Sequence, residues 1–230
     1  MVRLLIGLLV LTIPAAASAR GVSVCGKTFA RKTTEVSCYG RPWSTGLTDI
    51  KRLKVLRKLN LFLTEVTNAD LRHLAGLKTL KVLILVRTNV TDAGLKHLAG
   101  LKTLKELILV RTNVTNGGLK HLEGLKRLKK LYLAATKVTD EGLKHLTKLK
   151  TLRALDLAHT AVRDPGLSHL TGLKALKVLN LRATKVTDTG LKHLAKLKAL
   201  KVLDLSWTKV TAGGARKLQK ALPKCQITGP

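Results

Sequence analysis

A 24-residue period governs the chain from residue 56 onward and limits its fold more than any other feature. Each of seven copies opens with Leu, which we number position one, and Leu recurs at positions four and six, as in Leu80, Leu83 and Leu85. This spacing is typical of a short strand that buries alternate side chains. Positions 16, 19 and 22 are Leu in nearly all copies, which predicts one face of a helix. Neither half can bury its apolar side alone, so the copies must stack around a continuous core.

The repeated motif LxxLxLxxT, followed by VTDxGLxxLxxL, resembles the leucine-rich repeat family, with Thr where that family more often carries Asn. The resemblance implies an α/β fold, a leucine-rich-repeat solenoid with a curved parallel sheet on the concave side and helices on the convex side. The seven copies occupy residues 56–222. We expect an N-terminal cap with a degenerate half-repeat over residues 20–55 and a C-terminal tail over residues 223–230.

Residues 1–19 have the pattern of a secretory signal peptide. Arg3 precedes an apolar run over residues 4–13, and small residues follow up to Ala19. Because a bilayer needs about 20 apolar residues to be crossed, this run is too short for a membrane anchor. We expect cleavage after Ala19 and a secreted or periplasmic, extracytoplasmic mature protein.

The chain has three cysteines. Cys25 and Cys38 flank a short segment ahead of the repeats, and we expect them to form a disulfide, which an oxidising compartment permits. Cys225 is then the odd cysteine, either free or available for an intermolecular bond. Since no CxxC pair occurs, the sequence offers no zinc-binding motif.

Short polar residues recur where each helix should begin. We interpret the oxygen-bearing residues at position 13 as helix N-caps, because their side chains can accept from free backbone N–H groups. They are Asp92, Asn116, Asp140, Asp164 and Asp188. Gly follows two residues later, as in Gly118, and we expect it to permit close approach between stacked turns. Six histidines share position 18, and a file of parallel side chains favours packing over a convergent metal site.

The strand positions whose residues vary between copies contain the features specific to this chain. Positions five, seven and eight should project from the concave sheet, with an apolar strip in copies two to four and a polar half in copies five to seven. An exposed apolar patch usually marks an interaction site, and Tyr, Trp and Arg are frequent anchors. We expect an exported module that binds a protein with an acidic or mixed surface. The candidate residues are Ile84, Val86, Arg87, Ile108, Val110, Arg111, Tyr132, Asp156, His159, Asn180, Arg182, Asp204 and Trp207.

Net charge leaves a second function open. The chain has 43 Lys+Arg against 13 Asp+Glu, a formal charge of +30, which favours polyanionic partners. Much of this charge lies at positions two and 23, at the approach to each strand, and we expect these residues to form one broad basic edge. The alternative function is therefore electrostatic binding of anionic polysaccharide, lipid head groups or nucleic acid along this edge. An equally open interpretation is a solvated edge that prevents sheet aggregation. The edge residues are Lys81, Lys105, Lys129, Arg153, Lys177 and Lys201.

Two further classes are disfavoured. Asp156 and His159 lie on one strand and its exit, but no nucleophile elbow, phosphate loop or metal triad accompanies them. We therefore expect no enzyme, catalytic residue, cofactor, metal or small-molecule substrate. The VTDxGL turn also resembles the repeats of F-box substrate adaptors. No F-box segment fits within residues 20–55, and the export signal contradicts that role.

Overall fold

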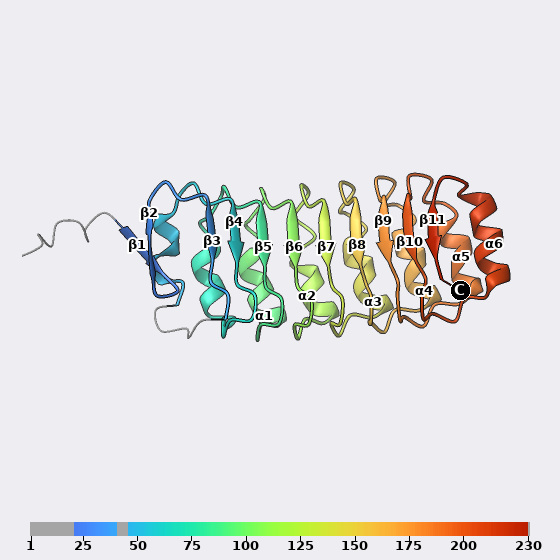
Figure 1. Cartoon of the computed structure of the whole chain (residues 1–230), viewed down its shortest axis with the longest axis horizontal. Helices are drawn as coiled ribbons and strands as arrows, with labels where there is room; N and C mark the ends of the chain where they lie inside the picture. The colour runs from blue at the N-terminus through green and yellow to red at the C-terminus, as the bar shows by residue number, and fades with distance from the viewer. Residues whose placement is uncertain (1–20, 41–45, 230) are drawn as a thin grey trace, which may run out of the picture.

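Repeated strands form one parallel sheet along the whole length of the molecule (Figure 1). The computed structural model describes residues 21–40 and 46–229, so the predicted signal peptide lies outside the described residues. The sheet has nine strands in the order β11-β10-β9-β8-β7-β6-β5-β4-β3. The strands are β3 (Glu35–Ser37), β4 (Lys58–Asn60), β5 (Val82–Ile84), β6 (Glu106–Ile108), β7 (Lys130–Tyr132), β8 (Ala154–Asp156), β9 (Val178–Asn180), β10 (Val202–Asp204) and β11 (Gln226–Thr228).

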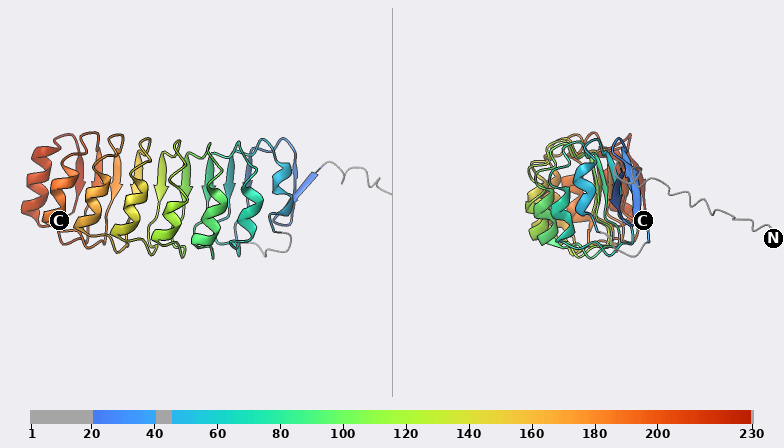
Figure 2. Two further views of the ribbon diagram at one scale, coloured as in Figure 1. Left: turned by 180° about the vertical axis from the view of Figure 1, so that it is seen from behind. Right: turned by 90° about the vertical axis from the view of Figure 1, so that its left-hand side faces the viewer.

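The return segments are short helices that cover the other face of the sheet (Figure 2). They are η2 (Thr48–Arg52), η3 (Asp70–Leu74), α1 (Asp92–Leu95), η4 (Lys96–Leu98), α2 (Asn116–Lys120), α3 (Asp140–Leu143), η5 (Lys144–Leu146), α4 (Asp164–Leu167), η6 (Ser168–Leu170), α5 (Asp188–Leu194) and α6 (Ala212–Ala221). Across the described ranges, no helix is long and apolar enough to cross a membrane. The predicted arrangement of sheet and helices on opposite sides is confirmed.

Leucine ladders fill the space between sheet and helices. Strands pair in register at equivalent repeat positions, so Leu59 lies beside Leu83 and Leu83 beside Leu107. These side chains are completely buried, as are Leu95 and Leu98 on the helical side. Burying one Leu side chain stabilises a fold by about 1.5–3 kcal/mol. The core therefore runs without interruption from one end of the stack to the other.

The residue at position 13 joins one repeat to the next instead of capping its own helix. Asp164 is the first residue of α4, and its Oδ1 accepts the N–H of Thr187 at 2.8 Å in the following repeat. Its Oδ2 accepts the Thr187 hydroxyl at 2.6 Å. The N-cap prediction was wrong, because this oxygen satisfies an orphan N–H of the neighbouring turn. The same bond recurs from Thr91 to Asn68, Thr115 to Asp92, Thr139 to Asn116, Arg163 to Asp140 and Thr211 to Asp188.

The glycine at position 15 is explained by the same contact. A Cβ on Gly118 would lie 2.5 Å from Oδ1 of Asp92 and 3.0 Å from Cδ1 of Leu95 in the preceding repeat. The predicted close approach between stacked turns is confirmed. A larger residue at this position would keep the carboxylate away from the next turn. The inter-repeat bond therefore requires glycine here.

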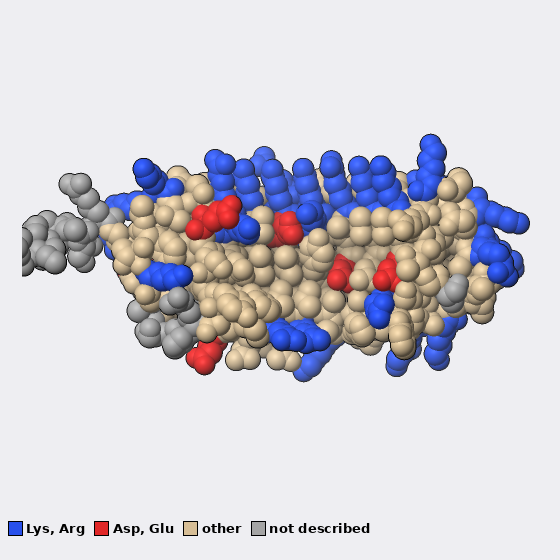
Figure 3. Space-filling model, in the orientation of Figure 1, with Lys and Arg blue, Asp and Glu red and all other residues tan. Residues whose placement is uncertain are grey.

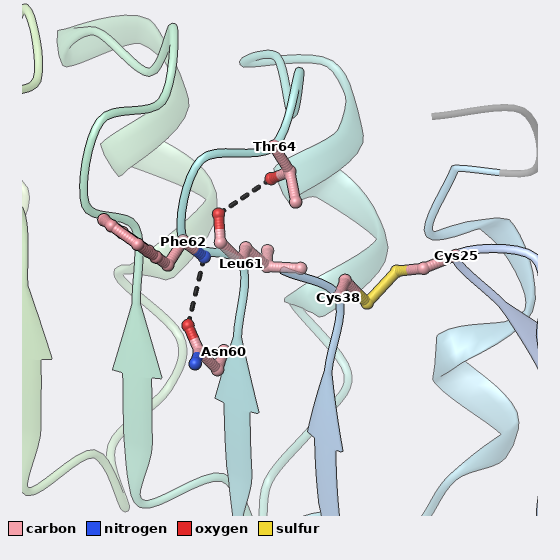
Figure 4. The surroundings of a disulfide bond; sticks show 6 residues. All are labelled: Cys25, Cys38, Asn60, Leu61, Phe62 and Thr64. Atoms are coloured by element: carbon pink, nitrogen blue, oxygen red, sulfur yellow. Dashed lines mark hydrogen bonds between the residues drawn. A yellow bond between two sulfur atoms is a disulfide. The ribbon is translucent and has the colours of Figure 1, made fainter. Parts of the chain in front are cut away.

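The N-terminal end of the core is closed by a disulfide-linked hairpin (Figure 4). Strands β1 (Gly21–Val24) and β2 (Lys27–Ala30) pair antiparallel, and Cys25 in their turn bonds Cys38, directly after β3. The disulfide prediction is thus confirmed. The sequence did not indicate that β3 joins the main sheet, where it pairs with β4. The cap therefore contributes a strand as well as the buried residues of the half-repeat, such as Ile50.

The C-terminal end is closed by α6 and β11. The predicted C-terminal tail, residues 223–230, instead supplies β11, which pairs with β10 in parallel register. Cys225, just before β11, is 4% exposed, and burial raises the pKa of its thiol. An intermolecular bond through this cysteine would require α6 and β11 to move apart. The structure thus favours the free alternative.

We expect the position-13 bond to stabilise the stack measurably. Asp164→Ala leaves the Thr187 N–H without its acceptor, which should lower the free energy of unfolding by about 1–3 kcal/mol. Asp164→Asn keeps an acceptor, as Asn116 does for Thr139, and should lose less than half of that amount. Urea unfolding followed by circular dichroism measures both. Equal losses for the two variants would show that the acceptor oxygen is unimportant.

The number of reactive thiols tests both the disulfide of the N-terminal cap and the burial of Cys225 near the C-terminus. In the unreduced protein, Cys25 and Cys38 are bonded and Cys225 is buried. A thiol reagent should therefore find almost no reactive thiol in the native protein and one per chain in denaturant. Native protein that reacts at once, or denatured protein that releases three thiols, would contradict the described cap and C-terminus.

Candidate binding face

The side of the sheet away from the helices, here called the sheet face, displays the side chains at positions three, five, seven and eight. Positions four and six are buried leucines, so alternation directs their strand neighbours outward. The strand residues at position three were missed in the sequence analysis. The alternation rule identifies them, but their mixed chemistry hides the pattern. They are Lys58, Val82, Glu106, Lys130, Ala154, Val178 and Val202.

An apolar strip crosses β5, β6 and β7. The strand register places Ile84 beside Ile108 and Ile108 beside Tyr132. Val86 and Val110 follow at position seven, and all five side chains are partly exposed. The structure thus brings together the apolar residues predicted for copies two to four. Figure 3 looks onto this face, and the charged side chains over the strands are few compared with those at its margins.

Carboxylate and amide side chains occupy the same position on β8, β9 and β10. Asp156 Oδ1 accepts the N–H of Ala158 at 3.0 Å, and Asp204 Oδ1 accepts that of Ser206 at 2.9 Å. Asn180 makes the same bond to the Arg182 N–H at 2.9 Å. Each side chain therefore closes the turn after its own strand with one oxygen. Figure 4 shows the equivalent bond from the Phe62 N–H to Asn60 at the other end of the sheet.

Asp156 lies in an unfavourable place for a charge. Burial raises the pKa of its carboxyl, the N–H of Ala158 opposes this shift, and the charge of Asp204 raises the pKa further. In the part of the chain that the structure describes, no ion pair or hydrogen bond joins Asp156 to His159. The acid–base pair considered from sequence is therefore not assembled there.

Position eight, three residues after each strand ends, has a residue in the left-handed backbone region. Its N–H donates to the position-seven carbonyl of the next repeat, as from Arg87 to Val110 at 3.0 Å. This conformation costs about 1–2 kcal/mol for a residue with a side chain. The turn is held by the hydroxyl of position nine, such as Thr88, which donates to the Leu85 carbonyl at 2.8 Å. The left-handed residues are Leu63, Arg87, Arg111, Ala135, His159, Ala183 and Trp207.

Because of this turn, position-eight side chains stand along the rim of the sheet face. Arg87, Arg111 and His159 are exposed there. Trp207 is 78% exposed and lies against the Arg182 guanidinium, whose carbon is 5.6 Å from the ring centroid. A large aromatic side chain held beside a cation on an open surface is a typical anchor for a partner.

The predicted basic edge lies apart from these residues. Lys81, Lys105, Lys129, Arg153, Lys177 and Lys201 stand at position two, directly before the strands begin. The sheet face and the basic edge are thus two different surfaces.

The histidine row lies on the helical side. His145 Nδ1 lies 2.7 Å from Glu123 Oε1, and the Lys148 ammonium donates to Glu123 Oε2 at 2.6 Å. Together these bonds, the one from Lys148 first, lower the pKa of Glu123 to about 2. Burial, together with nearby cations, lowers the pKa of His97 and His193. Within residues 21–40 and 46–229, no group of three or more His, Cys, Asp or Glu could hold a metal ion.

Comparison with known proteins supports the repeat and the fold. A family model described as "Leucine Rich repeat" matches residues 76–99, 148–170 and 197–218. Internalin inlF from Listeria monocytogenes is similar with a TM-score of 0.66 and 19% identity, over 87% of this chain and 62% of that one. Internalin C2 from the same organism has a TM-score of 0.59 and 25% identity, over 86% and 91% of the two chains.

A plant peptide hormone receptor, RGFR1 in complex with RGF2, is similar with a TM-score of 0.61 and 17% identity, over 87% of this chain and 32% of that one. This chain therefore spans less than two thirds of the inlF and receptor chains. No curated protein sequence matches it.

We expect the charge of Asp156 to lower the stability of the folded protein at neutral pH. Asp156→Asn keeps an oxygen for the Ala158 N–H, as Asn180 does for Arg182, and removes a charge that burial disfavours. Because the folded-state pKa is raised, ionisation destabilises the native state as pH rises through it. The variant should therefore unfold at higher urea concentration than wild type at pH 7, and this gain should vanish below the ordinary Asp pKa of about 3.9. A loss of stability at pH 7, or an equal gain at both pH values, would contradict this.

Proposed function

Because this chain is a leucine-rich repeat protein, we propose that it is an exported binding module that recognises a protein partner through its sheet face. The observation that carries the proposal is the apolar strip over β5, β6 and β7, where Ile84, Ile108 and Tyr132 lie side by side on a face that the helices leave open. Apolar side chains gathered on one open surface usually mark an interaction site. The proposal assigns no reaction to the protein.

The polar half supports a partner of mixed charge. Asn60 and Asn180 show that an amide oxygen is enough to close the turn after the strand. Asp156 and Asp204 therefore supply carboxylates that the turn does not need, and for Asp156 burial makes the charged form unfavourable. A partner with a cationic or hydrogen-bond-donating group over β8–β10 would compensate these charges. Acidic groups of the same partner would meet Arg87, Arg111 and Arg182.

The geometry suits an extended segment. A partner chain that crosses the strands meets an equivalent set of side chains at every repeat, about 4.8 Å apart. The solved receptor similar to this chain is described as a peptide hormone receptor in complex with RGF2. That complex supports a peptide or an extended protein segment as the class of partner. Trp207 and the apolar strip would serve as the two anchors, one at each end of the contact.

Export is supported by two features. The pattern of residues 1–19 is that of a cleaved leader. The Cys25–Cys38 disulfide is a bond that persists in oxidising compartments. Together they favour an extracytoplasmic partner over the intracellular one that an F-box adaptor would need.

The test uses the protein spanning residues 20–230 and a library of random peptides displayed on phage. Peptides selected on the wild-type protein are synthesised, and their affinities are measured by fluorescence anisotropy. Ile108→Asp, Tyr132→Ala and Trp207→Ala should each weaken binding by tenfold or more, because truncating a buried anchor commonly costs about 2 kcal/mol. Unchanged circular dichroism and melting temperature would show that each variant is folded.

Val55→Asp is the matched control for Ile108→Asp. Val55 is 41% exposed and lies outside the sheet face, so the same change of apolar side chain to carboxylate should leave peptide affinity within about twofold. Selected peptides that bind all three sheet-face variants as tightly as wild type would overturn the proposed function.

A further inference from the structure

A row of cations at position two is fixed in place by the main chain of the sheet. This basic row consists of Arg57, Lys81, Lys105, Lys129, Arg153, Lys177 and Lys201. The Lys81 carbonyl accepts the N–H groups of both Lys105 and Glu106, at 2.8 and 3.0 Å, and the same pair of bonds recurs along the stack. The side chains therefore leave the backbone at one strand spacing, about 4.8 Å, and the row is about 29 Å long. Figure 3 shows Lys and Arg side chains along one margin of the molecule, across the strand ends.

In a neighbouring row of lysines, at position 23, four side chains have a structural role that the basic row lacks. The ammonium groups of Lys126, Lys150, Lys174 and Lys198 donate to main-chain carbonyls of the next repeat, at 3.1–3.5 Å. These carbonyls lie near the ends of the helical segments, where acceptors are left without partners. In the described residues, by contrast, the side chains of the basic row make no hydrogen bond or ion pair. Their charges are left uncompensated by the fold.

Protection of the sheet against aggregation does not explain the basic row. In the described sheet, only the outer strands, β3 and β11, have a neighbouring strand on one side alone, so another sheet could add only there. The basic row instead runs across the ends of all the strands, at right angles to those edges. Most of the basic row therefore lies away from any sheet edge that it could protect.

Acidic side chains near the strand starts do not neutralise the row. Glu35 pairs with Lys58, and Glu106 pairs with Lys130, both on the sheet face. The aspartates at position 13 begin the helices, close to the opposite ends of the strands. Like charges about 5 Å apart repel one another, and a linear polyanion relieves this repulsion along the whole row at once.

We propose that the basic row binds a linear anionic polysaccharide that carries carboxylate or sulfate groups along its length. Five of its seven side chains are Lys, whose compact charge suits single anionic groups better than the paired contacts that Arg makes. Single-stranded nucleic acid usually needs aromatic side chains for stacking. The described aromatic residues lie elsewhere, with Tyr132 and Trp207 on the sheet face and its rim. The basic row is a line along one margin of the molecule, which fits a linear polymer better than the plane of a membrane.

This inference goes beyond the sheet-face function but shares its premise of export, which would bring the protein to cell-surface polysaccharides. The test measures dissociation constants for heparin and alginate between about 50 and 200 mM salt, with oligothymidylate and phosphatidylserine vesicles as competing classes. The triple variant K81Q/K105Q/K129Q should bind both polysaccharides at least tenfold more weakly at low salt. Its dependence of log affinity on log salt should be shallower by about one unit per lysine removed.

The matched control is K96Q/K120Q/K144Q, which removes the same charge from the helical side of the same repeats. It should weaken polysaccharide binding by less than threefold, and both variants should keep the wild-type melting temperature. Equal losses in the two triple variants would mean that net charge alone attracts the polymer, and would overturn the proposal. Tighter, row-dependent binding of oligothymidylate or vesicles would also overturn it. Peptides selected on the wild-type protein should still bind K81Q/K105Q/K129Q. Failure of the polysaccharide proposal can therefore be distinguished from failure of the sheet-face proposal.

Discussion

Burial of leucine side chains between successive repeats is the interaction on which the rest of this structure depends. A strand of three residues and a helical segment of a few residues cannot bury their apolar sides alone, so each repeat is stable only between two neighbours. Both ends of such a stack must be closed. The hairpin bonded to Cys38 packs against η2, which carries Ile50, at one end, and α6 with β11 closes the other.

Stacking also explains why the surface is organised in rows. Because a leucine recurs once in each strand at a fixed spacing, all the remaining repeat positions recur at that same spacing. This holds for positions with a structural role and for positions whose residue varies. Position 13 uses this regularity to join turns through bonds such as Asp164 to Thr187. Position five carries the apolar strip around Ile108. Position two carries cations such as Lys105 at the same fixed intervals.

Much of the fold could be predicted because it follows from local spacing. The buried leucines, the close approach at Gly118 and the Cys25–Cys38 bond were all expected from the sequence and are confirmed. The role of Asp164 was not predicted, because a side-chain oxygen is needed both for a cap on its own helix and for a bond to the next repeat. Its partner, Thr187, is 23 residues away, and only the stacked structure identifies it.

Two further differences have similar causes. Strands β3 and β11 lie outside the seven copies and carry little of the repeat motif, so only their pairing with β4 and β10 reveals them. In the candidate site, position three was not predicted because Lys, Val, Glu and Ala all occur there, without a common chemistry. The partner-binding roles of Ile84, Tyr132 and Trp207 stay predictions, since sequence and fold specify where these side chains lie but not what contacts them.

Methyl NMR of isoleucine tests the central claim most directly, because the described isoleucines divide between the sheet face and the core. Ile84 and Ile108 lie on the sheet face, whereas Ile50 is buried in the cap and Ile227 packs against the core from β11. On titration with a peptide selected from the random library, the methyl signals of Ile84 and Ile108 should shift and those of Ile50 and Ile227 should remain in place. A bound peptide that shifts only Ile50 or Ile227, or none of the four, would contradict recognition through the sheet face.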